Sequence, residues 1–365
     1  MFLHQPAYCE PTDRNHSPAP TNSTKGLVTV VFIVFFFKSP EKKIDPSERV
    51  PWKQQIRQLD LEGLVAFLPA IICLLLALQW GGSTYAWSNG RIIALFVLFG
   101  VFIIGFVGIQ FWKQDAGTLP PRLVKQRSVW APAWFSFCLG GAFFIPVYFV
   151  PIWFQAIKGT SAVQSGVDNI PMVLGLVIVS IVAGAGVTIV GYYTPFCIAA
   201  AALTAVGAGL LSTFTVHSGH AMWIGYQVLF GAGLGLGLQL PMIAVQAALP
   251  AEDIPTGTAV VIFAQTIGGA IMLSVGTNVF NNELFKGILK AVPDINPTTV
   301  LTAGATSLRS TPELVPHLAE ILVVYNKAIT QTFYASVAMG ALGLIGALAM
   351  EWRSVKGKNI EMAAA

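Results

Sequence analysis

Charged side chains are scarce in this sequence, because only 10% of its 365 residues are Asp, Glu, Lys or Arg. A typical soluble domain carries about 25%. Hydrophobic residues make up 55% of the chain, which excludes an ordinary soluble domain and indicates a polytopic membrane protein. The net charge of +4 is small and its cations lie in the loops, so no nucleic-acid partner is expected.

Cysteine is equally scarce. The four cysteines, Cys9, Cys73, Cys138 and Cys197, form no CxxC pair, and three lie in apolar segments. This pattern excludes a disulfide framework and a zinc site, and favours small packing residues. His217 and His220 lie three positions apart in a polar loop with no third ligand nearby, so a solvated loop is favoured over a metal site.

Catalytic signatures are missing as well. The sequence has no GxSxG, HExxH or Walker lysine motif, and the glycine run Gly231 to Gly237 follows no strand, as a dinucleotide fingerprint would require. We therefore expect no catalytic residues, no metal and no cofactor, and interpret the chain as a non-enzyme.

Long apolar runs dominate the remainder. Eight of them have the length of about 18 to 28 residues that crosses a bilayer as a helix. A ninth run, Gly26 to Phe37, spans only about 18 Å as a helix, which predicts a partial transmembrane helix. The fold class expected is an all-α integral membrane bundle, with full spans near Leu61–Gln79, Ile92–Trp112, Ala133–Phe154, Val167–Ile189, Pro195–Val216, Met222–Leu249, Thr258–Phe280 and Thr332–Met350.

Loop charge predicts the orientation. Lys and Arg gather in residues 38–58, in residues 113–127 and in the tail 351–365, so these segments are expected in the cytosol. Residues 1–25 are polar, lack the features of a signal peptide, and are expected to be disordered. The outer loop 281–331 is amphipathic around Leu314 to Ile329 and is expected to lie as short helices on the outer surface.

Glycine patterning predicts close helix packing. Small residues spaced four apart let a neighbouring helix approach closely in lipid. The residues expected to pack in this way are Gly231, Gly233, Gly235, Gly237, Gly268 and Gly269.

A polar and aromatic minority inside the spans has two interpretations. These side chains either form hydrogen bonds between helices, worth about 0.6 kcal/mol each, or line a cavity for a bulky, mostly apolar molecule. Gln239 and Gln246 lie seven apart with Pro241 between them, so they are expected to share a face. The cavity candidates are Tyr148, Gln239, Gln246, Phe263, Gln265 and Asn278.

Five sequence blocks together resemble the fungal fourteen-helix drug and toxin efflux transporters of the major facilitator superfamily. They are FFFKSPEKK at Phe35–Lys43, LDLEGLVAFLPAIICLLLALQWGG at Leu59–Gly82, YFVPIWFQAIKGTSAVQSGVDNIP at Tyr148–Pro171, GYYTPF at Gly191–Phe196, and GLGLGLQLPMIAVQAALPAEDIPTGTA at Gly233–Ala259. The resemblance covers residues 26–365 and implies the C-terminal portion of the fold, with two linker helices in 59–112 and a six-helix bundle in 129–350.

The resemblance implies export of hydrophobic secondary metabolites, toxins or drugs by proton antiport. The partners implied are the lipid bilayer, a hydrophobic small molecule and protons, in the plasma membrane or a vacuolar or vesicle membrane. The N-terminal bundle of the family, which would form the second wall of the substrate path, has no counterpart in the sequence. The alternative is therefore a truncated half that is incompetent for transport, and we expect that the chain alone does not catalyse coupled transport.

Overall fold

The computed structural model describes residues 60–82, 85–114 and 117–356. The expected N-terminal segments 1–25, 26–37 and 38–58 lie outside these residues. Within them the chain is helical and contains no named strand. The helices are α3 Leu61–Trp80, α4 Gly90–Lys113, α5 Pro121–Val124, α6 Arg127–Trp153, α7 Ala162–Asp168, α8 Ile170–Val190, α9 Thr194–Leu211, α10 His220–Gly237, α11 Leu240–Ala248, α12 Ile254–Ala291, α13 Pro297–Ser307 and α14 Leu318–Ala349.

Eight helical segments of the described chain are long and apolar enough to cross a membrane. The eight spans expected from the sequence are thereby confirmed. Three of these spans combine two helical segments. α6 is followed directly by a π-helical turn, Phe154–Lys158, α7 is followed by α8, and α10 is followed by α11. The protein is a multi-pass integral membrane protein.

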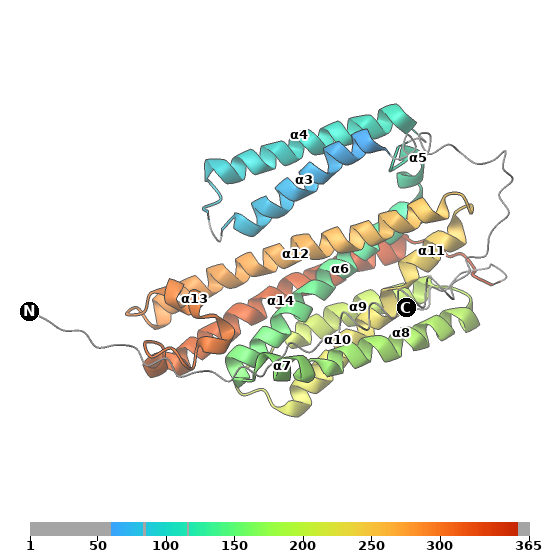
Figure 1. Cartoon of the computed structure of the whole chain (residues 1–365). Coiled ribbons are helices and arrows are strands. Elements are labelled where there is room, and N and C mark those ends of the chain that lie inside the picture. The colour runs from blue at the N-terminus through green and yellow to red at the C-terminus, as the bar shows by residue number, and fades with distance from the viewer. Residues whose placement is uncertain (1–59, 83–84, 115–116, 357–365) are drawn as a thin grey trace, which may run out of the picture. The chain divides into compact units, whose positions relative to one another are not determined.

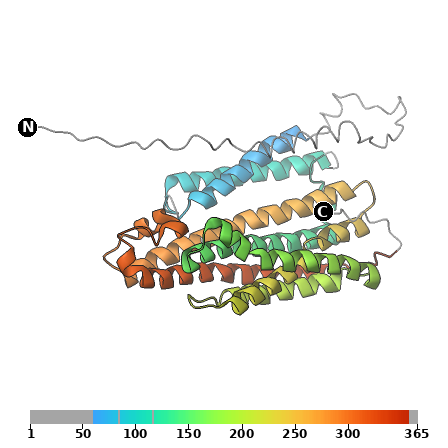
Figure 2. The same ribbon diagram turned by 60° about the horizontal axis from the view of Figure 1, so that its bottom comes forward.

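The spans are packed in two parts (Figure 1). α3 and α4 form a hairpin, and α12 is the helix that packs against α3. The remaining helices form a bundle in which α12 and α14 flank α6, α8 and α9 flank α10, and α14 also contacts α9. Figure 2 shows the same hairpin beside α12 from a second direction.

Burial separates inner from outer helices. α6 and the α10–α11 segment are the most buried spans, whereas few residues of α3, α4 and α8 are buried. Val65, Ile104 and Ile181, for example, are 70%, 72% and 68% exposed. Since large exposed apolar surfaces are rare on soluble proteins, these faces are suited to lipid.

The stretch 281–331 differs from the expectation of short surface helices. α12 continues to Ala291, α14 already begins at Leu318, and only α13 and a single 3-10 turn lie between them. The apolar residues responsible are buried rather than spread on a membrane surface: Leu284, Ile288, Ile321 and Ile329. Their spacing of four and eight residues places them on one face of each helix, and that face packs into the bundle.

Candidate functional site

The glycines of α10 lie against two different helices. A Cβ on Gly231 or Gly235 would collide with backbone atoms of α8. A Cβ on Gly233 would lie 2.5 Å from the backbone nitrogen of Thr204 in α9, and one on Gly237 would lie 2.8 Å from the Cβ of Ala200 in the same helix. Because positions i and i+4 share a face of the helix, the two glycines of each pair lie against the same neighbouring helix, the first pair against α8 and the second against α9.

α12 crosses α6 at a second close approach. Gly268 lies against the backbone of Phe137, and Gly140 of α6 lies against the backbone of Gln265. Gly269 is covered by the ring of Phe144. This crossing fixes the part of α12 that carries Gln265.

The two glutamines after the glycine run do not have the same environment. α10 ends at Gly237, so the helix breaks before Gln239, and Pro241 lies in the first turn of α11, where a missing N–H is tolerated. Gln239 is exposed and Gln246 is half-buried. Neither side-chain amide has a hydrogen-bond partner among the residues that the structure describes.

Two other candidates face the α3–α4 hairpin. The Asn278 amide donates to the carbonyl oxygen of Leu78 in α3 at 3.1 Å, and the ring of Phe263 lies 5.1 Å from that of Phe67. The Oδ1 atom of Asn278 is buried without a partner in the described chain. Asn278 therefore forms the kind of hydrogen bond that the first of the two interpretations, hydrogen bonding between helices, requires, because its amide links α12 to α3.

Tyr148 lies on α6 and is 48% exposed, with its ring 5.1 Å from that of Phe149. The six candidates therefore do not converge on one site. Phe263 and Asn278 contact α3, Gln265 lies at the α6 crossing, and Tyr148, Gln239 and Gln246 retain free polar groups.

At one end of the bundle a carboxylate organises the hairpin. Asp60 caps α3 and accepts hydrogen bonds from the amide of Gly63 at 3.0 Å, Gln110 Nε2 at 2.7 Å, Lys113 Nζ at 3.0 Å and the amide of Thr118 at 3.1 Å. Burial alone would raise the pKa of Asp60, but these hydrogen bonds, led by that from Gln110, outweigh it and hold the pKa well below its usual range.

The same end holds a charge pair between distant segments. Arg122 of α5 donates two hydrogen bonds to Asp253, which precedes α12, at 2.9 and 2.8 Å. Arg127 Nε also donates to the carbonyl oxygen of Ala349 at 2.6 Å. Among the described residues, Lys113, Arg122 and Arg127, which belong to a predicted cytosolic loop, thus lie at one end of the bundle, and the side of the membrane stays a prediction.

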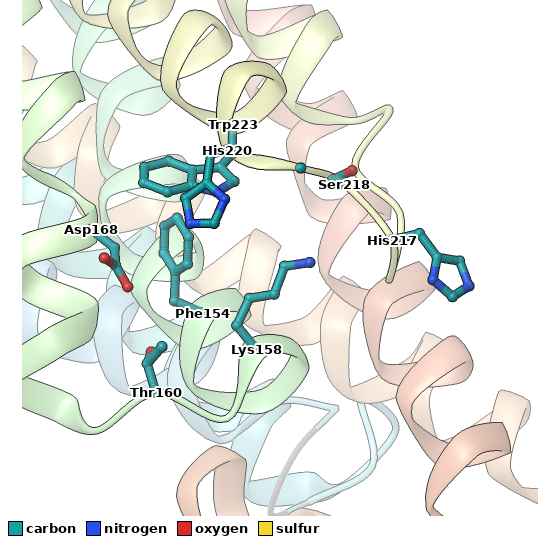
Figure 3. Close-up of a pocket in the computed structure, with 9 residues that line it drawn as sticks. Phe154, Lys158, Thr160, Asp168, His217, Ser218, His220 and Trp223 are labelled. Atoms are coloured by element: carbon teal, nitrogen blue, oxygen red, sulfur yellow. The ribbon is translucent and has the colours of Figure 1, made fainter.

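At the opposite end lies a cavity of about 330 Å³. Figure 3 shows its side chains, which come from the π-helical turn after α6 and the residue Thr160 beyond it, the end of α7, the loop before α10 and the first turn of α10. Phe154 and Trp223 are in edge-to-face contact, with ring centroids 4.9 Å apart. Lys158 and Asp168 bring opposite charges to this cavity.

Sequence reasoning missed this cavity. The loop that carries His217 and His220 was interpreted only as solvated, and both residues are exposed. No group of three metal-ligating side chains occurs in the described part of the chain. The available signal was weak: Lys158 and Asp168 bracket a short turn between two spans.

Comparison with known proteins gives close relatives. The chain is 52% identical over 342 residues to the MFS-type efflux pump MFS1 of Trichophyton rubrum, covering 93% of this chain and 63% of that protein. It is 52% identical to the MFS-type transporter astH of Aspergillus oryzae, covering 93% and 59%, and 49% identical to the efflux pump roqT of Penicillium rubens, covering 91% and 61%. The chain therefore spans about three-fifths of the length of these relatives.

No family model matches the chain. Among solved structures, a bacterial homologue of the human lysosomal transporter Spinster has a TM-score of 0.47 and 14% identity, covering 74% of this chain and 62% of that one. This similarity is too low to support a conclusion.

Proposed function

Because this chain belongs to the major facilitator superfamily, as its homology with fungal MFS-type efflux pumps shows, we propose that it serves in the export of hydrophobic secondary metabolites, toxins or drugs. The observation that carries this proposal is an identity of about half over 93% of the chain to the efflux pump of Trichophyton rubrum. In this proposal α3 and α4 are the linker pair, and the spans from α6 to α14 form the C-terminal bundle.

The surface chemistry of the bundle supports such a cargo. Gln239 and Gln246 have amides without partners in the described chain, and α11, which holds Gln246, packs against α6 and α12. Phe144 and Tyr148 of α6 are 37% and 48% exposed. Aromatic walls with a few free amides suit a large apolar molecule that carries a few polar groups.

We also propose that export is coupled to proton antiport, which is a more specific claim than export itself. A coupling proton needs a titratable group within the membrane, and the carboxylates of the described spans lie near span ends, as Asp168 and Glu320 do. This observation favours a second candidate, a membrane polypeptide of the same fold that does not transport by itself.

We also propose the plasma membrane as the location of this protein, which a fluorescent fusion would test.

Reconstitution distinguishes the two candidates. The purified chain would be placed in liposomes under an imposed proton gradient and supplied with a panel of hydrophobic fluorescent dyes. Saturable, gradient-dependent dye movement above empty vesicles would support export. A folded, correctly inserted protein that moves none of the dyes would favour the second candidate.

If dye movement is observed, two variants test the cargo path. Gln239→Leu and Gln246→Leu should lower the rate for substrates with polar groups while protein abundance is unchanged. Gln331→Leu is the matched control, because it makes the same change on α14 outside the candidate set. Normal export by both glutamine variants would assign these amides to structure or to lipid contact.

A further inference from the structure

The α3–α4 hairpin rests on the bundle through a narrow interface. Among the described helices, α4 packs chiefly against α3, and α3 packs against α12. The contacts between α3 and α12 include the ring pair of Phe67 and Phe263 and the hydrogen bond from Asn278 to Leu78. Few residues of either hairpin helix are buried. Because lipid provides no hydrophobic driving force between helices, this interface by itself holds the hairpin weakly.

The chain that follows α4 is bound back to the base of the hairpin. Asp60 accepts hydrogen bonds from the backbone nitrogen of Thr118 at 3.1 Å and from its hydroxyl at 3.2 Å. Gln110 Oε1 accepts from the backbone nitrogen of Leu119 at 2.8 Å, and Gln110 Nε2 donates to Asp60 at 2.7 Å. The chain passes so close that a Cβ on Gly117 would lie 2.4 Å from Gln110 Oε1. Asp60 and Gln110 are buried, so their low-dielectric surroundings strengthen these bonds.

The next residues are bound to the bundle instead. Leu123 of α5 is 1% exposed and packs where α6, α11 and α12 meet. Its partners in this apolar cluster are Val129, Val245, Leu249 and Val261. Arg122 also donates two hydrogen bonds to Asp253, at the start of α12. Figure 1 shows α5 between the end of the hairpin and the bundle.

Only Pro120 and Pro121 separate these two sets of anchors. A proline ring fixes its own φ near −65° and restricts the residue before it, so Leu119 and Pro120 are both confined. The Pro120 carbonyl oxygen also accepts a hydrogen bond from the backbone nitrogen of Leu123 at 2.9 Å. Residues 117–123 therefore form a short, stiff connection, the strut, between the base of the hairpin and the start of α12.

We propose that the strut makes the α3–α4 hairpin follow the start of α12 as one rigid body, with Asp60, Gln110 and Leu123 as its positioning residues. The anchors act in series, because releasing either one lengthens the flexible connection by the residues that it held. A hairpin without the strut would swing about its narrow interface with α12. This inference goes beyond the proposed export, since it holds whether or not the chain moves a cargo.

The test is a distance measurement by pulsed electron paramagnetic resonance on the purified full chain in lipid nanodiscs. Spin-labelled cysteines replace Ile104 of α4 and Ile345 of α14, which are 72% and 57% exposed, in a background without Cys9 and Cys73. The wild-type strut should give a single narrow distance distribution.

Two variants release the strut at its two ends. Gln110→Leu removes the acceptor for Leu119, and Leu123→Ala removes the apolar anchor in the bundle. Each should broaden the distribution by several ångströms, up to roughly 7 Å, because two freed residues add about 3.3–3.6 Å of reach each. The double variant should broaden it no more than either single variant, since the anchors act in series.

Leu211→Ala is the matched control. Leu211 is as buried as Leu123 but lies on α9, which does not pack against α3, α4 or α5. This variant should lower the melting temperature without broadening the distribution. If a strut variant fails to fold, Asp60→Asn and Leu123→Val release the same two ends with smaller changes in shape.

Four results would overturn the proposal. A wild-type distribution as broad as that of the folded variants would mean that the hairpin already swings. Unchanged distributions in the folded variants would mean that the interface with α12 holds the hairpin without the strut. Additive broadening in the double variant would identify two independent contacts. Equal broadening by Leu211→Ala would assign the effect to general loosening of the bundle.

Discussion

Replacing Gly233 by alanine should separate α9 from α10. The added Cβ would lie 2.5 Å from the Thr204 nitrogen and 2.8 Å from the Leu203 carbonyl carbon. Both are backbone atoms, so no side-chain rotation relieves the contact. Restoring an ordinary van der Waals distance requires the two helices to move apart by roughly 1 Å, which forfeits about a quarter to a half of the dispersion energy of the atom pairs involved.

The expected cost is about 1–3 kcal/mol, as for overpacking of a core. The energy that is lost is van der Waals packing between helices. In lipid this packing, rather than the hydrophobic effect, holds helices together. One kcal/mol changes the melting temperature of a domain of roughly 150–250 residues by roughly 2–4 °C, and by less in a longer chain such as this one. The variant should therefore melt below its control, by no more than roughly 12 °C.

Gly225→Ala is that control, because Gly225 lies on the same helix and a Cβ there meets nothing within 4 Å. Both variants gain the same helix propensity, so their difference isolates the packing term. Unfolding can be followed with a thiol-reactive dye in a background without Cys9 and Cys73. The reporters are then the buried Cys138 and Cys197, and Cys197 belongs to α9.

A melting temperature of Gly233→Ala equal to or above that of Gly225→Ala would refute the reasoning. It would mean that α9 and α10 tolerate a wider separation, and that the glycine spacing does not determine their approach.

Three further predictions concern the charged residues at span ends. Arg122→Gln should lower the free energy of unfolding by on the order of 1 kcal/mol or less, because the Arg122 side chain is 51% exposed and solvent screens the ion pair. Asp253→Asn should lower it by the same amount, and the double variant by no more than either single variant. Additive losses in melting temperature would contradict the pairing. Asp60→Asn should melt below the wild type at neutral pH. The hydrogen bonds depress the folded-state pKa of Asp60, so its stabilisation is complete above the unfolded value of about 4 and is lost as the pH falls further; melting curves that stay equally far apart in acid would contradict this. An impermeant thiol reagent applied to intact cells should label a cysteine placed at Ser161 and spare one placed at Lys125, and the reverse pattern would invert the topology.

The sequence alone determined the number and approximate limits of the described spans. The thickness of the hydrocarbon core sets the length of an apolar helix, and the lipid leaves the backbone no alternative partner. It also identified glycines that lie at helix contacts, since small residues four apart are a one-dimensional pattern. The stretch 281–331 was misjudged because an amphipathic face suits a membrane surface and a protein neighbour equally well.

Only the tertiary structure decided what each side chain meets. Asn278 and Gln265 are both polar residues of α12, yet one bonds α3 and the other lies at the crossing with α6. Lys158, Asp168 and Trp223 share a cavity because three separate segments end together. Periodicity reports which residues share a face of one helix, but it cannot report which neighbour covers that face, because that choice depends on the packing of all the helices at once.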